Sequence, residues 1–262
     1  MNEKKIENIA EFEKAVSEVQ YGRMPFIGEQ YQELYRGQSK ESYELKSGIA
    51  RYAKTAEDIR QIEKNVLNDF RDLINETENT KKFIQLSTHN DDFQNDWRLL
   101  EQIQHYRLPT RLLDWSLDPK IGLFFAVERN LEDNGQFWIF KSPLNWSNDD
   151  HFIHNPYSED LNIISNSSFY IDDNYKDKIA EQRRGIQSGK FTVQDYNKSM
   201  SALEKQNDIK DRFIKYIIPA NSKKLFLDYL AKMNITEETL YVKYDDEIEN
   251  LVSKIKGKYN FK

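Results

Sequence analysis

An arginine ends an apolar stretch near the N-terminus, where residues 34–39 read Leu-Tyr-Arg-Gly-Gln-Ser. A guanidinium in apolar surroundings is costly unless its charge is matched. A diphosphate or a carboxylate would match Arg36 with paired hydrogen bonds, and Gly37 has no side chain to hold a ligand away from the backbone. A buried ion pair that closes a strand would explain the same residues. This stretch therefore predicts either an anion-binding arginine or a structural ion pair.

Polar residues are interspersed with apolar ones over residues 104–116, which read Gln-His-Tyr-Arg-Leu-Pro-Thr-Arg-Leu-Leu-Asp-Trp-Ser. One interpretation is structural: Arg111 and Asp114 form an ion pair, and the hydroxyls of Thr110 and Ser116 hold turns of the backbone. The other interpretation is functional, with Trp115 as the floor of a pocket lined by His105, Thr110, Asp114 and Ser116. The stretch contains no nucleophile elbow of a serine hydrolase.

A third stretch, residues 183–192, places Gln187 between two glycines and before an alternating run typical of a strand. It predicts either a β-turn that enters the strand or a glutamine at the edge of a cleft. The chain has no Cys, and its close histidine pair, His151 and His154, lies beside two aspartates. A solvated polar loop explains that pair better than a metal site does, so we expect no metal.

Two apolar periodicities predict the elements that position these residues. Short continuous runs predict strands at residues 33–37, 112–115, 137–140 and 213–218. Helical spacing predicts helices over residues 6–19, from Thr55 onward with Asp58 as its capping partner, over 93–106, after Asp118-Pro119, over 222–233 and over 246–256. We therefore predict an α+β fold with a small mixed or antiparallel sheet and surrounding helices. We place an N-terminal helix at 1–24 and the main domain, with a C-terminal helical extension, at 25–262.

The net charge and the absence of certain sequence features disfavour several classes of function. The chain has 262 residues and a net charge of −6, which disfavours extensive wrapping of nucleic acid but allows a small local patch. Neither a signal peptide nor an apolar run of membrane-spanning length is present. We therefore expect a cytoplasmic protein with no membrane partner. The sequence also lacks the glycine-rich fingerprints of dinucleotide-binding and P-loop folds.

Taken together, these stretches resemble the FRG domain, which is named for an aromatic-Arg-Gly motif. The resemblance rests on residues 35–38, 104–106, 109–116, 121–126, 187–191 and 217–220. It covers roughly residues 25 to 250. The glycine usual after the His-Tyr pair is replaced here by Arg107.

A second, more distant resemblance is to mono-ADP-ribosyltransferases of the Arg-Ser-Glu class. In that class the arginine binds the NAD diphosphate, the next residue contacts nicotinamide through its backbone, and a serine supports the NAD site. By position these are Arg36, Gly37 and Ser116. The resemblance implies NAD as co-substrate and no metal. The other NAD-contacting residues would be Tyr35, Tyr106 and Trp115 as stacking rings, with His105 and Thr110 beside them.

The chain departs from that class where a Gln/Glu-x-Glu motif is expected, because residues 187–189 read Gln-Ser-Gly. Either the carboxylate comes from elsewhere in the chain, or Gln187 or Asp114 replaces the missing glutamate and acts with Arg36 in catalysis, or the domain binds its ligand without catalysing. Glu181 and Glu128 are further carboxylates outside any recognisable motif.

Three hypotheses of function follow. The first is an ADP-ribosyltransferase that acts as an intracellular toxin or anti-phage effector. It would modify a macromolecular acceptor, protein or nucleic acid, and would need a neutralising antitoxin. The second is a non-catalytic FRG module that binds a nucleotide, a nucleic acid or a protein. The third, ranked last, is a nuclease or other hydrolase that uses Glu101, His105 and Asp114, whose spacing matches no metal template.

Overall fold

The computed structural model describes residues 4–21, 31–74, 92–143, 155–158, 164–166, 189–241 and 246–261. Strands and helices are mixed in order, which confirms the predicted α+β class. The strands are β1 (Lys4–Lys5), β2 (Tyr31–Gln38), β3 (Leu113–Ser116), β4 (Gly135–Pro143), β5 (Ile164–Asn166), β6 (Gly189–Val193) and β7 (Phe213–Ile218). The helices are α1 (Ile9–Tyr21), α2 (Ala56–Ile74), α4 (Asp92–His105), α5 (Pro119–Val127), α7 (Ala220–Ala231), α8 (Glu237–Leu240) and α9 (Asp246–Tyr259).

The strands form one mixed sheet in the order β1-β7-β4-β2-β3-β6-β5. β1 runs parallel to β7, and the other neighbours are antiparallel. β2 pairs with β4 along its whole length, from Tyr31 opposite Pro143 to Gln38 opposite Gln136. Its pairing with β3 is confined to Tyr35 opposite Ser116. The sheet is therefore continuous on one side of β2 and loosely joined on the other.

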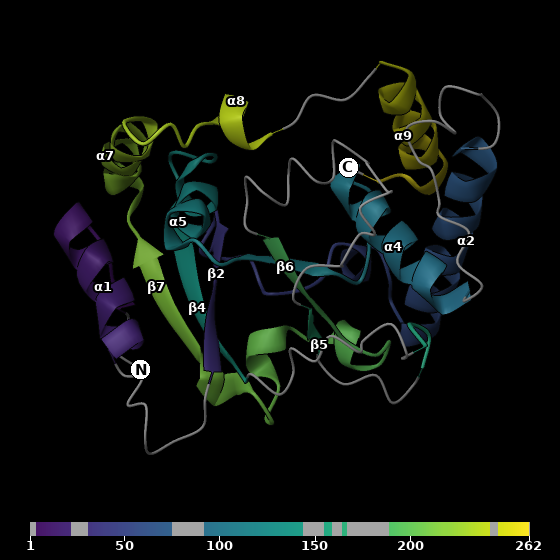
Figure 1. The fold of residues 1–262 in the computed structure, drawn as a ribbon, viewed down its shortest axis with the longest axis horizontal. Coiled ribbons are helices and arrows are strands. Elements are labelled where there is room, and N and C mark those ends of the chain that lie inside the picture. The colour runs from purple at the N-terminus through teal and green to yellow at the C-terminus, as the bar shows by residue number, and fades with distance from the viewer. Residues whose placement is uncertain are drawn as a thin grey trace.

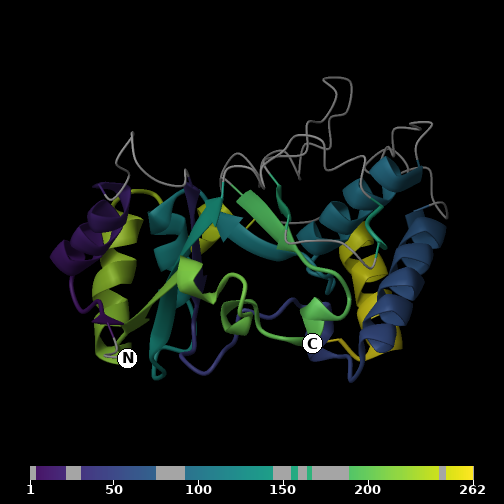
Figure 2. The ribbon, with the colours of Figure 1, turned by 90° about the horizontal axis from the view of Figure 1, so that it is seen from below.

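Two groups of helices pack against this sheet at opposite ends (Figures 1 and 2). α1, α5 and α7 lie with β2, β4 and β7, and their apolar faces share one core with these strands. α2, α4 and α9 gather at the other end, where their apolar faces pack with Phe191 and Val193 of β6. The two ends meet through β3, which links the two halves of the sheet. Among the described residues, none of the helices combines the length and apolar character needed to span a bilayer.

α5 lies directly on the backbone of β2. An added Cβ on Gly37 would come within 2.0 Å of the Gly122 carbonyl oxygen and 2.2 Å of the Ala126 nitrogen. An added Cβ on Gly122 would come within 2.9 Å of the Tyr35 side chain. Both glycines therefore permit a helix-to-strand distance that no larger residue allows. Gly37 also borders the cleft described below, where its role as open backbone beside a ligand stays a prediction.

The start of α5 follows the sequence prediction. The Asp118 carboxylate accepts a hydrogen bond from the Lys120 amide at 2.8 Å, and Pro119 occupies the first turn. Pro119 fits there because the first amides of a helix have no intrahelical partner. The strand at 213–218 is also found with the predicted bounds.

The chain turns before β4 at residues 130–133, ahead of Gly135. The Asp133 amide donates to the Asn130 carbonyl at 3.0 Å, and Asn130 has a φ of 51°. Gly135 instead opens β4, where an added Cβ would lie 2.2 Å from the Ala126 carbonyl oxygen. The glycine therefore serves close packing against α5 and not the turn.

Candidate functional site

A cleft of about 620 Å³ lies where β2 and β3 separate. Its walls are the second half of β2, the last turn of α4 with the residues that follow it, β3, and the last turn of α5. The short 3-10 helix Ile49–Arg51 and its neighbour Tyr52 close another side. A cleft of this volume accommodates a ligand of nucleotide size.

Arg36 reaches this cleft from β2. Its Nη1 donates to the backbone carbonyl of Asp114 and lies 3.8 Å from the Asp114 carboxylate. The two side chains are 18% and 53% exposed, respectively. Burial lowers the pKa of Arg36 to about 10; Asp114 opposes this effect and the positive charge of Arg51 adds to it. The buried Arg36 Nε has no hydrogen-bond partner among the described residues, so this guanidinium retains unused donor capacity.

Asp114 is held in place by a short chain of side chains. Gln104 Nε2 donates to Asp114 Oδ2 at 2.8 Å, and the Thr110 hydroxyl donates to Gln104 Oε1 at 2.6 Å. Thr110 Oγ1 also accepts from the Leu112 amide at 3.1 Å, which confirms its predicted turn. Thr110 is therefore a support for Asp114 and is not itself among the residues that line the cleft.

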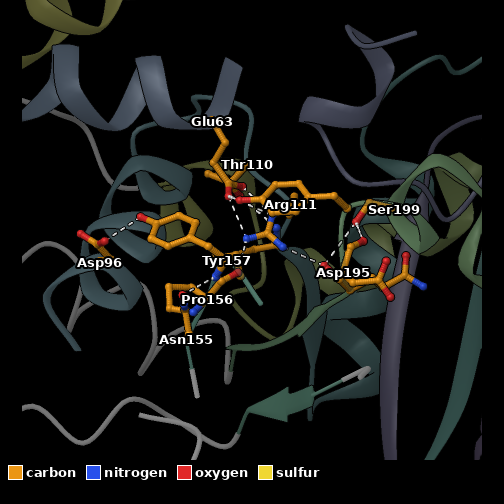
Figure 3. Close-up of polar contacts among 12 residues, drawn as sticks. Glu63, Asp96, Thr110, Arg111, Asn155, Pro156, Tyr157, Asp195 and Ser199 are labelled. Carbon is orange, nitrogen blue, oxygen red and sulfur yellow. Dashed lines mark hydrogen bonds and ion pairs between the residues drawn. The ribbon is translucent and has the colours of Figure 1, made fainter. Parts of the chain in front are cut away.

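The predicted ion pair between Arg111 and Asp114 is wrong, because Arg111 binds elsewhere. Its Nη2 lies 2.8 Å from the Glu63 carboxylate, and its Nη1 and Nη2 donate to the carbonyls of Gln194 at 2.9 Å and Pro156 at 2.6 Å (Figure 3). The guanidinium also stacks 3.9 Å from the centre of the Tyr196 ring. The Arg111 side chain is fully buried in this network, so it is a structural residue and Asp114 is left to face the cleft.

Ser116 and His105 both border the cleft, and each also contacts a residue close to it in the sequence. Ser116 Oγ accepts from the Asp118 amide at 3.0 Å, so it holds the turn that starts α5, as one of the two interpretations predicted. His105 ends α4, and its Nε2 lies 3.6 Å from the Glu101 carboxylate one turn earlier. Among the described residues, no three His, Asp or Glu side chains are arranged as metal ligands.

The exposed rings of the cleft are not the predicted ones. Tyr35, Tyr106 and Trp115 are each at most 3% exposed. Tyr35 stacks on Phe137, Tyr106 packs beside Phe70, and the Trp115 indole donates to Thr192 and packs on Phe140. None of the three has a free face for a ligand. Tyr43 and Tyr52, which also line the cleft, are 40% and 36% exposed; Tyr43 lies beside Arg51, and Tyr52 packs edge-on against Phe261.

These two tyrosines are cleft residues that the sequence patterns do not reveal. They belong to a segment without apolar periodicity, and no motif marks them. Their spacing does place them on either side of Gly48, and Arg51 lies next to Tyr52. The Arg51 guanidinium lies 5.9 Å from the centre of the Tyr43 ring, so this wall of the cleft is both aromatic and cationic.

Basic side chains dominate the lining of the cleft, although the chain as a whole has a net charge of −6. The acidic residues that line it are Asp114 and Glu128, and the basic ones are Arg36, Arg51, Arg107, Arg129 and Lys190. Burial raises the pKa of Glu128, an effect that the hydroxyl of Tyr241 opposes by donating to the carboxylate at 2.8 Å. The excess of positive charge favours an anionic ligand.

Several predicted residues cannot be compared with the structure. Gln187, Glu181, His151 and His154 lie outside the described residues. Of the predicted site residues that are described, Arg36, Asp114, Tyr35, Gly37, His105, Trp115 and Ser116 line one cleft, whereas Tyr106 and Thr110 lie behind it. The three stretches are therefore brought together as far as the structure describes them.

Comparison with known families agrees with this geometry. Residues 32–135 match the sequence model of the FRG domain family. The chain contains an FRG domain. This domain supplies Arg36, Asp114 and the end of α5, whereas Lys190 and Tyr241 reach the cleft from beyond it. No curated protein and no solved structure matches the chain.

Proposed function

We propose that the chain binds NAD in the cleft of its FRG domain and transfers ADP-ribose to a macromolecular acceptor. The observation that carries this proposal is the Arg36 guanidinium, which faces the cleft with a buried Nε that lacks a hydrogen-bond partner among the described residues. A diphosphate supplies the charge and the acceptor oxygens that such a group requires. Arg51 lies close enough to lower the pKa of Arg36, so an anion would relieve repulsion between two cations.

The other cleft residues fit the remaining parts of NAD. The partly exposed ring of Tyr43 lines the cleft and can pack against a planar ring of the ligand. In the reaction, the bond from the ribose C1′ to nicotinamide breaks and nicotinamide leaves with the electron pair. A nucleophile of the acceptor forms the new bond to C1′ and loses a proton. The transition state is oxocarbenium-like, and the Asp114 carboxylate, held by Gln104, is the group that we assign to its stabilisation.

Labelled NAD tests this proposal directly. The protein is incubated with labelled NAD and cell extract, and both nicotinamide release and label transfer are measured. We expect both to fall at least about 100-fold in Arg36→Ala, because diphosphate positioning contributes that much in comparable sites. Lys232→Ala, which removes one positive charge from an exposed site outside the cleft lining, is the matched control.

A wild-type protein that neither releases nicotinamide nor transfers label would refute the transferase. Equal activity in Arg36→Ala would instead refute the assignment of Arg36. If the transferase acts on an essential molecule of its own cell, it is a toxin or an anti-phage effector. Its expression without an antitoxin then slows growth, and Arg36→Ala relieves this.

The second candidate function is a binding module without catalysis. The sequence supports a binding module because residues 187–189 read Gln-Ser-Gly, whereas the transferases have a Gln/Glu-x-Glu motif at this place. Calorimetric titration separates the two functions. Binding of NAD or ADP-ribose that depends on Arg36, without release of nicotinamide, would select the module.

A further inference from the structure

Arg107 holds a backbone conformation that favours glycine. Its φ is 60°, in the left-handed region that costs a residue with a side chain conformational energy. It ends α4, where its amide donates to the Gln104 carbonyl at 3.0 Å and the next amide donates to the Ile103 carbonyl at 3.1 Å. Glycine would end the helix equally well and without strain. A strained non-glycine residue at a cleft is a reason to look for a function of its side chain.

The Arg107 side chain packs against an aromatic ring at one end of the cleft. Its guanidinium lies 4.9 Å from the centre of the Tyr241 ring, and the Arg129 guanidinium lies 5.6 Å from the same centre. All three residues line the cleft. Arg107 is exposed, and its contacts among the described residues include no ion pair. The hydroxyl of Tyr241 is engaged by Glu128, which fixes the ring between the loop after α4 and the end of α5.

We propose that Arg107, together with Arg129 and the ring of Tyr241, forms a second phosphate-binding subsite of the cleft, separate from the one at Arg36. This inference deepens the proposed function and rests on it for the first phosphate at Arg36. The guanidinium groups supply donors for phosphate oxygens, and the tyrosine supplies a platform for an attached sugar or base. The phosphate belongs either to a dinucleotide with an additional phosphate monoester or to a nucleic-acid acceptor.

The electrostatics of the two ends support two separate subsites. At one end, burial lowers the pKa of Arg36; Asp114 opposes this effect and Arg51 adds to it. At the other end, Arg107 and Arg129 line the cleft with Glu128, whose carboxylate lies 3.8 Å from the Nε of Arg129. Each end of the cleft therefore contains two arginines and one acidic residue. A phosphate bound at each end would neutralise both pairs of arginines.

Arg107→Gly is the decisive variant because glycine suits a φ of 60° and the protein should keep or gain thermal stability. Asn234→Gly, at another residue with a φ of 60° but outside the cleft lining, controls for the backbone change. Arg107→Lys keeps the charge. NAD, NADP and a short single-stranded oligonucleotide are the probes, and the dissociation constant of each is measured by titration at several salt concentrations.

We expect Arg107→Gly to weaken binding of NADP or of the oligonucleotide about tenfold and to leave NAD binding nearly unchanged. The probe affected identifies the source of the phosphate. For the oligonucleotide, the slope of log affinity against log salt should also fall by about one.

Unchanged affinities for NADP and the oligonucleotide in Arg107→Gly would overturn the proposal, as would a failure of both to bind the wild-type protein. An equal loss for NAD would also overturn it, because Arg107 would then belong to the first site. A loss of thermal stability without a change in binding would make the contact with Tyr241 a purely structural one. If NAD fails to bind but the oligonucleotide binds in a way that depends on Arg107, the transferase would be refuted. The second phosphate-binding subsite would still be supported.

Discussion

Asp114 is the acidic residue of the cleft that the structure holds most directly beside Arg36. Gln104 donates to its carboxylate at 2.8 Å, and Arg36 Nη1 lies 3.8 Å away. Glu128, the other acidic lining residue, is engaged by the Tyr241 hydroxyl at 2.8 Å, and its burial raises its pKa. A carboxylate that must stabilise a developing positive charge has to be accessible to the substrate. The Asp114 side chain is 53% exposed and that of Glu128 is 11% exposed, so accessibility favours Asp114.

Asp114→Asn tests that assignment at the scale of one residue. The amide keeps the shape and the contact with Gln104 but removes the charge, so we expect nicotinamide release to fall about 100-fold or more with a small change in KM. Glu128→Gln is the comparison, for which we expect a smaller loss. The reverse ranking in steady-state kinetics would transfer the role to Glu128.

α2 begins with a pair of reciprocal caps, as the sequence predicted from Thr55 and Asp58. The Asp58 amide donates to Thr55 Oγ1 at 3.1 Å, and the Thr55 amide donates to the Asp58 carboxylate at 2.9 Å. The Lys54 amide donates to the same carboxylate at 3.0 Å. These amides would otherwise lack intrahelical partners. α2 carries Glu63, so this helix start also positions the buried partner of Arg111.

The caps make a prediction about acid stability at the scale of this helix. Hydrogen bonds from the amides of Lys54 and Thr55 lower the pKa of Asp58 below its ordinary value of 3.8. Their contribution to stability is therefore fully present above pH 3.8 and is lost as the pH falls through the lower folded value. Asp58→Asn should unfold at a lower temperature than the wild type at pH 5, and the difference should shrink toward pH 3. A constant difference in Tm across this range would contradict the prediction.

Across the whole molecule, Arg111 joins segments that are far apart in sequence. Its guanidinium binds Glu63 of α2 and the carbonyls of Pro156 and Gln194, while the Tyr196 hydroxyl donates to Glu63 at 3.2 Å (Figure 3). Burial disfavours the charge of Arg111, yet Glu63 and the nearby tyrosines outweigh this and raise its pKa. The network secures the helical end of the molecule to the segment that leads into β3, the strand that carries Asp114.

Removing Arg111 alone should destabilise the fold more than removing both charges of its ion pair with Glu63. Arg111→Met leaves the Glu63 carboxylate buried without its partner and should lower the free energy of unfolding by about 3–5 kcal/mol. The double variant Glu63→Met/Arg111→Met should recover more than half of that loss, because no charge is then left unpaired. Urea unfolding of both variants measures the difference. A double variant no more stable than Arg111→Met would show that the carbonyl contacts outweigh the ion pair.

The sequence by itself determined many of the helices and strands and the FRG domain that this chain contains. Local signals sufficed for the caps of α2 and α5, for the bounds of β7 and for the strand that carries Arg36, because each depends on neighbouring residues. The FRG pattern was readable for the same reason, and the φ of Arg107 explains physically why glycine fits the position after the His-Tyr pair.

Only the tertiary structure decided which residues share the cleft and which support it. The partner of Arg111 is 48 residues away, and no spacing rule selects it over the nearby Asp114. The burial of Tyr35, Tyr106 and Trp115, and the exposure of Tyr43 and Tyr52, likewise depend on how distant elements pack. The backbone of α5 fills the space that a side chain at residue 37 would occupy. Pairing and burial between remote segments are set by the packing of the whole chain, which local sequence patterns do not encode.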